Sequence, residues 1–330
     1  LNKLLKWLLV FLLAVIAAVA ALLFVPKDNG KTYRVKVAKN QGISSVSRKL
    51  ADDDLIYNRH VLMLAAYATG MHNQLKACTY RMHAKAAAWD VLQKLRSGRP
   101  DTVSVKIVEG MRFATMRKII NETESIQHDT AQWSDEKLMA EIAPDAMNPN
   151  PEGQFFPDSY EIDADSSDIQ IYRLAYKTMQ RELSAAWDER QSGLPYKNPY
   201  ELLIMASIIE KETGHPADRA HVSSVFKNRL AIGMRLQTDP TVIYGMGAAY
   251  QGKIRKADLR RDTPYNTYTR AGLTPTPIAL PGKAALEATA HPSTEKYLYF
   301  VSRKDGTGLS QFSHTLDEHN AAVRKYILKK

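Results

Sequence analysis

Residues 199–212 read Pro-Tyr-Glu-Leu-Leu-Ile-Met-Ala-Ser-Ile-Ile-Glu-Lys-Glu, and this stretch decides the fold of the chain. Asn198 and Pro199 supply a helix cap and a first-turn proline, so we expect a helix to begin here. The middle of the stretch is apolar on nearly every side, which is typical of a helix that is buried all round. The helix ends in two carboxylates, Glu210 and Glu212, and burial of a carboxylate is costly.

The two carboxylates follow different faces of this helix. Glu212 extends the face with the largest apolar side chains, whereas Glu210 extends a smaller and more polar face; these faces carry Met205, Ile208 and Ile209 on one side and Leu203, Ala206 and Ser207 on the other. Burial raises the pKa of a carboxyl group, and a protonated Glu at neutral pH is a general acid. Glu212 is therefore the candidate catalytic acid. Two alternatives stay open: both carboxylates solvate the helix end, or one pairs with an arginine.

Amide, hydroxyl and aromatic side chains gather in the loops after this helix, and such groups are typical of a sugar site. The candidate substrate-binding residues are Glu210 at the end of this helix, Asn228 near the end of the next one, and Gln237, Thr238, Asp239, Tyr244, Tyr265, Asn266 and Tyr268 in the segments that follow. Asp239-Pro240 has an alternative role as the cap and first residue of a short helix. The stretch 265–268 is equally compatible with an ordinary loop.

The N-terminal segment predicts a membrane span. Trp7 to Val25 gives 19 residues without a charge, enough to cross a bilayer core of about 30 Å. Lys3 and Lys6 precede the run, which favours a cytoplasmic N-terminus. A cleaved signal peptide is the alternative, but the apolar run is long and ends in Leu-Leu-Phe-Val-Pro, a poor cleavage site. We expect a single-pass protein of the cytoplasmic (inner) membrane, with the rest of the chain in the periplasm or extracytoplasmic space.

The composition narrows the range of partners. The net charge of +10 fits an anionic partner such as lipid headgroups or a cell-wall polymer. Nucleic acid is not expected, because no run of five Lys or Arg and no nucleic-acid motif occurs. Cys78 is the single cysteine and cannot form an internal disulfide. No zinc-ligand spacing and no Gly-rich phosphate loop appears, so no metal and no cofactor is expected.

The pattern predicts an α+β fold in three parts: a cytoplasmic stub and transmembrane helix at 1–26, a small domain at 27–100 and a larger domain at 101–330. In the small domain we expect a strand at 33–37, a helix from 43, a helix from 58 to 70, a strand at 75–82 and a helix at 84–96. The order strand, helix, helix, strand is similar to a LysM-like glycan-binding module.

The larger domain opens with a predicted strand at 103–108, and residues 109–112 turn the chain into a helix. Residues 144–158 contain four prolines and read as a loop. An amphipathic helix is expected at 167–189, followed by the helix that ends at Glu212 and by another that carries Val222 to Leu230. A buried strand at 297–301 and a final helix at 318–328 complete the prediction.

The motifs resemble the YceG/MltG family of membrane-anchored endolytic murein transglycosylases. The likeness rests on Ala-Ser-Ile-Ile-Glu-Lys-Glu-Thr at 206–213, on the uninterrupted stretch from Gly233 to Gly245, and on the segments 108–112, 152–158, 225–230, 263–268, 281–282 and 290–292. It covers essentially the whole chain, including the anchor and the small LysM-like domain. One departure is Cys78, where the family commonly has Gly; a positive φ there would strain the turn.

The resemblance implies that Glu212 is the catalytic residue and that the substrate is the glycan strand of peptidoglycan. It implies endolytic cleavage between MurNAc and GlcNAc in nascent strands, which forms 1,6-anhydro ends and terminates elongation, with peptidoglycan synthases as partners. Lytic transglycosylation needs one carboxyl group, whereas glycoside hydrolysis uses two. Two other functions remain open: a membrane-tethered, non-catalytic glycan-binding scaffold, and a muramidase that uses Asp239 as its second carboxylate.

Overall fold

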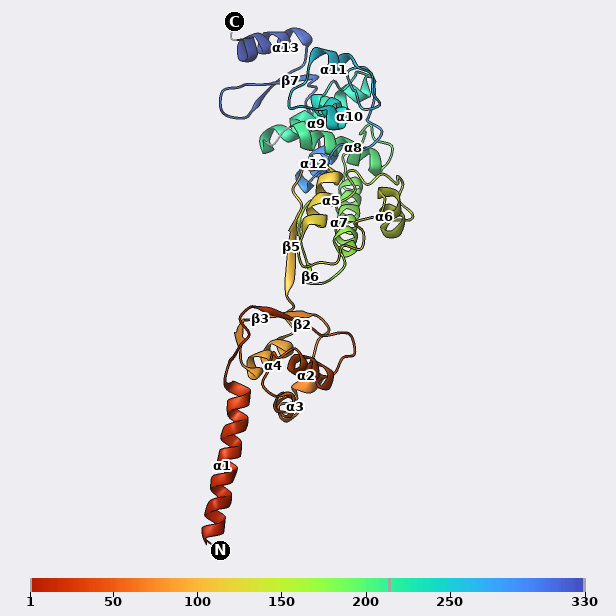
Figure 1. Cartoon of the computed structure of the whole chain (residues 1–330). Coiled ribbons are helices and arrows are strands. Elements are labelled where there is room, and N and C mark those ends of the chain that lie inside the picture. The colour runs from red at the N-terminus through yellow and green to blue at the C-terminus, as the bar shows by residue number, and fades with distance from the viewer. Residues whose placement is uncertain (1, 213–214, 329–330) are drawn as a thin grey trace. The chain divides into compact units, whose positions relative to one another are not determined.

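A computed structural model describes residues 2–212 and 215–328 of the chain (Figure 1). The chain divides into two units, of which the N-terminal one holds the residues up to Val103 together with Ser125–Gln127 and Glu161–Ser166. Ser104–Glu124, His128–Tyr160 and the residues from Ser167 onward form the other unit. The first division lies after Val103, and the two short later segments of the N-terminal unit fall within the range 101–330 of the predicted larger domain.

The N-terminal unit has the predicted order of strand, helix, helix and strand. After α1 (Asn2–Phe24), its elements are β1 (Lys27–Asp28), β2 (Tyr33–Lys36), α2 (Ile43–Asp52), α3 (Arg59–Ala68), η1 (Met71–Asn73), β3 (Thr79–Met82), β4 (Lys85–Ala86) and α4 (Ala88–Ser97). β2 pairs antiparallel with β3, and β1 with β4. Asn58 caps α3, because its side chain accepts from the amides of His60 and Val61, and the helix therefore begins close to the predicted residue 58.

Two predictions for this unit are wrong in detail. The predicted strand at 75–82 is shorter, since β3 begins at Thr79. The helix predicted from residue 84 begins at Ala88, because Lys85 and Ala86 pair with β1 and the Asp90 carboxylate then accepts from the Ala87 amide at 3.0 Å. Cys78 is not among the residues with positive φ, so the cysteine does not strain the turn.

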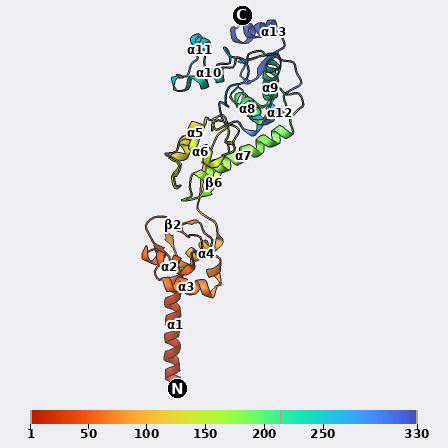
Figure 2. The ribbon, with the colours of Figure 1, turned by 90° about the vertical axis from the view of Figure 1, so that its right-hand side faces the viewer.

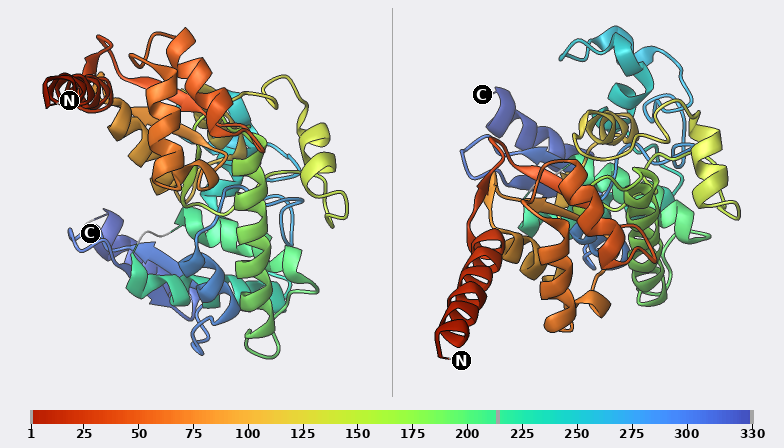
Figure 3. Two further views of the ribbon diagram at one scale, coloured as in Figure 1. Left: turned by 90° about the horizontal axis from the view of Figure 1, so that it is seen from below. Right: turned by 60° about the horizontal axis from the view of Figure 1, so that its bottom comes forward.

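The apolar helix α1 joins the N-terminal unit through its last turns (Figure 3). Lys3–Phe24 is long and apolar enough to cross a membrane, although a signal sequence has the same properties. Leu23 is buried in the core of the unit, with Val19 and Leu22 packed beside it. The Phe24 ring lies 5.6 Å from the ring of Trp89 on α4. The end of α1 is therefore part of a folded core rather than the start of a loose linker.

The second unit consists mostly of helices. Its elements are α5 (Phe113–Glu122), α6 (Asp135–Ile142), α7 (Ile169–Asp188), α8 (Pro199–Glu212), α9 (Pro216–Ala231), α10 (Asp239–Met246), η2 (Gly247–Ala249), α11 (Lys256–Arg260), α12 (Lys283–Ala290), β7 (Tyr299–Ser302), β8 (Ser310–Ser313), α13 (Leu316–Val323) and the π-helical turn η3 (Arg324–Leu328). β5 (Thr102–Lys106) and β6 (Ser159–Asp163) pair with each other, and the division between the units falls within both strands.

Helix α8 is the core of this unit. Every residue from Leu202 to Ile209 is buried, which confirms the prediction of a helix enclosed on all sides. Helices α7, α9, α10 and α12 contact it, and Figure 2 shows α9 and α12 close beside α8. Ser207 is the buried polar residue on its apolar stretch; its hydroxyl donates to the Ile204 carbonyl at 2.7 Å and accepts from the Ile278 amide at 3.0 Å. The buried Ser207 hydroxyl and the Ile278 amide thus both have a hydrogen-bond partner within the protein.

The C-terminal elements differ slightly from the prediction. The strand expected at 297–301 is β7, which starts at Tyr299 and is partly rather than fully buried, because it pairs only with β8 in a two-stranded sheet. The final helix starts at Leu316 instead of residue 318. Thr315 and Glu318 form a capping box there, in which each side chain accepts from the backbone amide of the other.

We expect Gly153→Ala to destabilise the protein more than Gly193→Ala. Both glycines have positive φ, 80° and 76°, so each substitution carries a backbone cost of about 1–2 kcal/mol. A Cβ on Gly153 would lie 2.3 Å from Cβ of Pro277, whereas one on Gly193 would meet nothing within 4 Å. Overpacking should therefore add about 1–3 kcal/mol at Gly153 alone. Equal losses in denaturant unfolding of the two variants would contradict this.

Candidate functional site

Glu212 is the last residue of α8 and lies against the start of α10. The hydroxyl of Thr238, which is the N-cap residue of α10, donates to Oε1 of Glu212. The Thr238 amide in turn donates to Oγ1 of Thr267 at 3.1 Å. Gln237 takes a positive φ of 52° to bring the chain into this helix start. The end of one helix and the beginning of another are thus joined at the Glu212 carboxyl group.

Glu212 lines a cavity of about 550 Å³. Its walls come from α8, α9, α10, the β7–β8 hairpin and α13, and they consist of Glu212, Phe226, Arg229, Leu236, Gln237, Asp239, Tyr268, Tyr299, Phe300, Val301, Ser302, Ser310, Leu316 and His319. Charged, hydroxyl and aromatic groups share this surface, as a site for a sugar polymer requires.

The pKa of Glu212 is raised to about 7, chiefly by burial and to a lesser degree by the negative charge of Asp239. The Thr238 hydroxyl and the positive charge of Arg229 act in the opposite direction, because both stabilise the carboxylate. The carboxyl group can therefore hold a proton near neutral pH and still lose it readily. This is the property expected of a group that serves first as acid and then as base.

Glu210, two residues earlier, has different surroundings. Burial raises its pKa too, but one of its oxygens accepts from the Gly282 amide at 3.0 Å. A backbone N–H can only donate and therefore favours the charged carboxylate, whereas a hydroxyl can donate to a carboxylate or accept from a carboxylic acid. The Thr238 hydroxyl can thus serve both protonation states of Glu212. This difference favours Glu212 over Glu210 for proton transfer, as the helix faces predicted.

Four of the predicted substrate-binding residues lie around Glu212. Gln237, Asp239 and Tyr268 line the same cavity, and Thr238 contacts the carboxyl group directly. Asp239 stands in the first turn of α10, and its Oδ1 accepts from the Tyr268 hydroxyl at 2.6 Å. The alternative role of Asp239 as a helix cap is wrong, because Thr238 is the N-cap residue of α10 and Asp239 is already its first residue. Asp239-Pro240 does begin a short helix, and Asp239 also lies in the cavity wall.

Other predicted residues lie outside that cavity, with their polar groups bonded within the fold. Asn228 donates to the carbonyls of Glu295 and Tyr297. Asn266, which is 1% exposed, donates to the carbonyls of residues 258, 259 and 261. Glu210 is held by Gly282. Amides that bond backbone carbonyls have the same sequence appearance as amides in a sugar site, and for this reason the sequence pattern did not separate the two roles.

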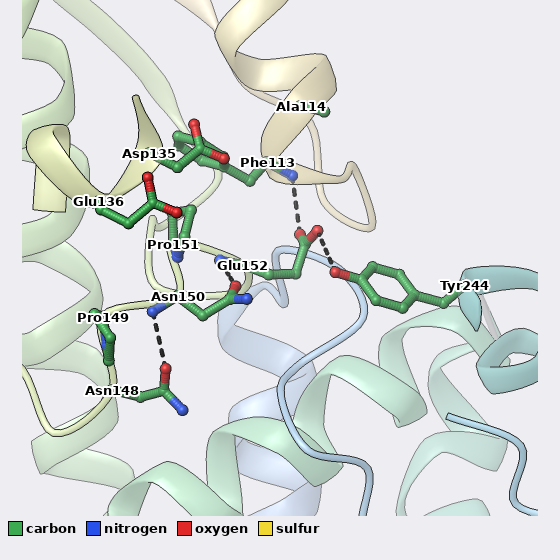
Figure 4. A pocket seen from close by; sticks show the side chains of 10 residues that line it. All are labelled: Phe113, Ala114, Asp135, Glu136, Asn148, Pro149, Asn150, Pro151, Glu152 and Tyr244. Carbon is green, nitrogen blue, oxygen red and sulfur yellow. Dashed lines mark hydrogen bonds between the residues drawn. The ribbon is translucent and has the colours of Figure 1, made fainter. Parts of the chain in front are cut away.

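Tyr244 and Tyr265 also lie away from the Glu212 cavity. Their rings contact each other at 4.8 Å, and the Tyr265 hydroxyl bonds with Oγ1 of Thr276 at 2.9 Å. Tyr244 lines a second cavity of about 410 Å³, whose other walls include Phe113, Asp135, Asn148 and Glu152 (Figure 4). Tyr244 therefore lies between the Tyr265 ring and the second cavity, and neither tyrosine lines the cavity that contains Glu212.

Arg229 is a residue of the site that the sequence analysis missed. It is 7% exposed, and it donates to the carbonyls of Leu298 and Leu236 at 2.7 and 2.6 Å. Burial lowers the pKa of its guanidinium group. Its spacing was an available signal, because Arg229 lies three, four and seven residues after Phe226, Val225 and Val222 and so continues the buried face of α9.

Tyr299 and His319 were also missed, and here the sequence held no usable signal. The two rings stack at 5.2 Å with an interplanar angle of 23°, and Arg229 lies 5.3 Å over the Tyr299 ring. They come from β7 and α13, far along the chain from Glu212. Only the packing of the β7–β8 hairpin onto α9 brings them to the cavity. Within the described residues, no group of His, Cys, Asp and Glu could hold a metal ion.

Three comparisons with known proteins agree. A family model described as the YceG-like family matches residues 35–325. The endolytic murein transglycosylase of Bacillus subtilis is 32% identical over 93% of this chain and 88% of its own length. That of Streptococcus pneumoniae is 25% identical, and the match spans 94% of this chain and 61% of the relative. The crystal structure of the YceG-like protein lmo1499 of Listeria monocytogenes matches with a TM-score of 0.55 and 29% identity, over 88% of this chain and 99% of that one.

We expect Glu212→Gln to stabilise the protein more at about pH 8 than at about pH 5. Folding raises the pKa of this carboxyl group to about 7, so the folded state loses stability as pH rises through that range, where the unfolded chain is already ionised. The uncharged amide of the Glu212→Gln variant does not ionise, so the variant does not lose this stability as pH rises. Melting temperatures at the two pH values measure the effect, with Glu189→Gln at the exposed end of α7 as control. An equal change at both pH values would contradict the raised pKa.

Proposed function

The chain belongs to the YceG-like family, and on that premise we propose that it is an endolytic murein transglycosylase in which Glu212 carries out the proton transfers. The observation that carries the proposal is a partly buried carboxyl group with a pKa of about 7 in a polar, aromatic cavity. Peptidoglycan is the substrate that the names of the relatives imply, since murein is the glycan on which those proteins act.

In the proposed mechanism, protonated Glu212 donates its proton to the oxygen of the MurNAc–GlcNAc bond. The bond from that oxygen to C1 of MurNAc breaks, and positive charge develops at C1. The C6 hydroxyl of the same sugar then attacks C1 and gives its proton to the Glu212 carboxylate. The products are a 1,6-anhydro-MurNAc end and a GlcNAc end, no water is consumed, and Glu212 has regained its proton.

Two neighbours support this cycle. Arg229, fixed by two backbone carbonyls, supplies the positive charge that favours the transient Glu212 carboxylate. The Thr238 hydroxyl accompanies both protonation states without leaving a buried polar group unpaired. We further propose that Gln237, Asp239, Tyr268 and the stacked pair of Tyr299 and His319 bind the sugars on either side of the bond. Aromatic faces of this kind suit the apolar face of a pyranose ring.

We propose an anchoring role for α1 and a strand-holding role for the N-terminal unit. α1 would span the cytoplasmic membrane with its N-terminus inside, and the strand–helix–helix–strand unit would act as a LysM-like module that holds the glycan. Tethering raises the local concentration of enzyme where new strands emerge. Cutting there would release nascent strands from their synthases, which are the proposed protein partners.

We expect Glu212→Gln to abolish cleavage while the fold is kept. Loss of general acid–base catalysis commonly costs about 10²–10⁴-fold in rate, and the amide keeps the size of the side chain. Mass spectrometry of glycan strands incubated with the enzyme gives the answer, because an anhydro end is one water lighter than a hydrolysed end. Glu210→Gln should be milder, since its carboxylate is bound by Gly282 away from the cavity.

Each other outcome of this experiment would contradict the proposed function or the proposed role of Glu212. Hydrolysed ends would indicate a muramidase with Asp239 as the second carboxylate. No change in strand length with the unaltered chain would indicate a glycan-binding scaffold. Full activity of Glu212→Gln would remove Glu212 from the mechanism.

We expect two truncations to separate anchoring from folding. Deletion of residues 1–18 removes most of the span but keeps the buried Leu23, the partly buried Leu22 beside it and the contact of the Phe24 ring with Trp89. Deletion of residues 1–26 removes those contacts as well, and a buried apolar side chain is worth about 1.5–3 kcal/mol. The shorter deletion should therefore melt higher, while both proteins cut isolated glycan. Equal melting temperatures would show that the end of α1 does not stabilise the unit.

In cells, neither truncated protein should restore normal strand length when it is exported at the same level as the full chain. Normal strand length with either truncation would show that the tether is dispensable.

A further inference from the structure

Glu152 is a buried carboxylate that the proposed chemistry does not use. It is 6% exposed, and both of its oxygens are bonded: one accepts from the Phe113 amide at 2.9 Å and the other from the Tyr244 hydroxyl at 3.1 Å (Figure 4). Phe113 is the first residue of α5, and Tyr244 lies in α10. One side chain thus ties two helices together.

The loop that carries Glu152 is itself firmly held. Oδ1 of Asn150 accepts from the Glu152 amide at 2.9 Å, and Oδ1 of Asn148 accepts from the Asn150 amide at 2.8 Å. The Gln154 side chain donates to the carbonyls of Asn148 and Asn150 at 2.7 and 2.6 Å. These bonds fix the backbone from which Glu152 projects. A helix start such as that of α5 needs only a short polar side chain as its cap. The second hydrogen bond of Glu152, from the Tyr244 hydroxyl, is therefore not needed to cap α5.

Arg112 adds a second grip on α10. Its guanidinium lies 4.8 Å over the Tyr244 ring, and its Nη2 donates to the Ile243 carbonyl at 3.1 Å. The positive charge of Arg112 also stabilises the Glu152 carboxylate, against the burial that raises the pKa of that group. Arg112 thereby contacts both the Tyr244 side chain and the Ile243 backbone of α10.

The other end of α10 reaches Glu212. Thr238 is the N-cap residue of α10, and its hydroxyl donates to Glu212 instead of bonding the helix. The Thr241 hydroxyl donates to the Thr238 carbonyl at 2.8 Å and bonds with Oγ1 of Thr267 at 2.8 Å. Tyr244 lies six positions after Thr238, which is a rise of about 9 Å along a helix. α10 is therefore a short, stiff element held at one end by Glu152 and in contact with the candidate acid at the other.

We propose that Glu152 is a positioning residue of the glycan-cleaving reaction, which acts through Tyr244 and helix α10 to hold the Thr238 hydroxyl against Glu212. The inference rests on the proposed role of Glu212. Glu152 is not a catalytic residue, because it lines the second cavity and not the one that Glu212 lines. Its effect is to keep α10 closed over Glu212, so that water stays out and the carboxyl group keeps its direction.

Release of α10 would change the acidity of Glu212, because burial is the main cause of its raised pKa. A looser α10 admits water, the pKa falls, and the acid is lost at lower pH. The charged and titratable groups that share the cavity with Glu212 are Arg229 on α9, Asp239 on α10, Tyr268, Tyr299 on β7 and His319 on α13. The pKa of His319 lies below its usual value, so the alkaline limb of the pH–rate profile reports Glu212.

The test compares Tyr244→Phe, Glu152→Gln and Glu152→Ala in the full-length chain, with kcat, KM and the pH–rate profile measured on isolated glycan strands. Tyr244→Phe removes only the hydroxyl, so we expect kcat to fall roughly 10-fold, as for a displaced catalytic group, with KM little changed. The alkaline limb should move to lower pH. Glu152→Gln should retain most of the activity, since its amide can accept from Phe113 and donate to Tyr244. Glu152→Ala should lose roughly 10- to 100-fold.

Tyr196→Phe is the matched control, because the Tyr196 hydroxyl is buried without a hydrogen-bond partner in the described structure. It should leave kcat and the alkaline limb unchanged. A Tyr244→Phe variant with unaltered kcat and pH profile would overturn the inference. So would a loss of activity that follows the melting temperature while the alkaline limb stays in place.

Failure of the inference is distinguishable from failure of the proposed mechanism. If Glu212→Gln is inactive and Tyr244→Phe behaves like the unaltered chain, Glu212 keeps its role and Glu152 loses its own. If Glu212→Gln is fully active, the proton-transfer mechanism itself is wrong.

Discussion

The requirement on which this structure depends is that a carboxyl group stays out of water at the end of a helix with no polar side. Taking a carboxylate out of water is unfavourable, so the group keeps its proton unless nearby charges and hydrogen bonds compensate. Helix α8 imposes the burial, since residues 202–209 are all enclosed. The capped start of α10, the buried Arg229 and the β7–β8 hairpin then set how strongly Glu212 holds its proton. Displacement of any of these elements would change the acidity.

Much of this arrangement was predictable because it is local. An all-round apolar helix with Asn198-Pro199 at its start is recognisable in any chain, and the face of that helix already favoured Glu212 over Glu210. The start of α3 was predicted for the same reason, because Asn58 caps the helix from the adjacent position. Such features depend on residues within one or two turns of each other, and that spacing is visible in a sequence.

The walls of the cavity were predicted less well because they are assembled over long distances. Tyr299 and His319 meet Glu212 only after the hairpin and α13 have packed, and nothing in their immediate sequence marks them. Asn228 and Asn266 show the opposite failure: both have the appearance of sugar-binding amides, but their side chains bond backbone carbonyls. A residue type indicates what a side chain can bond, whereas the fold decides which partner it finds.

The connection between α1 and the N-terminal unit has a mechanical consequence. A flexible linker absorbs a pull by straightening, and the domain behind it is free to swivel. Here Leu23 belongs to the domain core and the Phe24 ring contacts Trp89, so tension along α1 acts directly on the packing of this unit. If the helix is fixed in a bilayer, the first folded part of the chain cannot rotate independently of it. If this unit holds a glycan strand, a force on the strand would then be transmitted directly to the membrane helix, because no flexible linker lies between them.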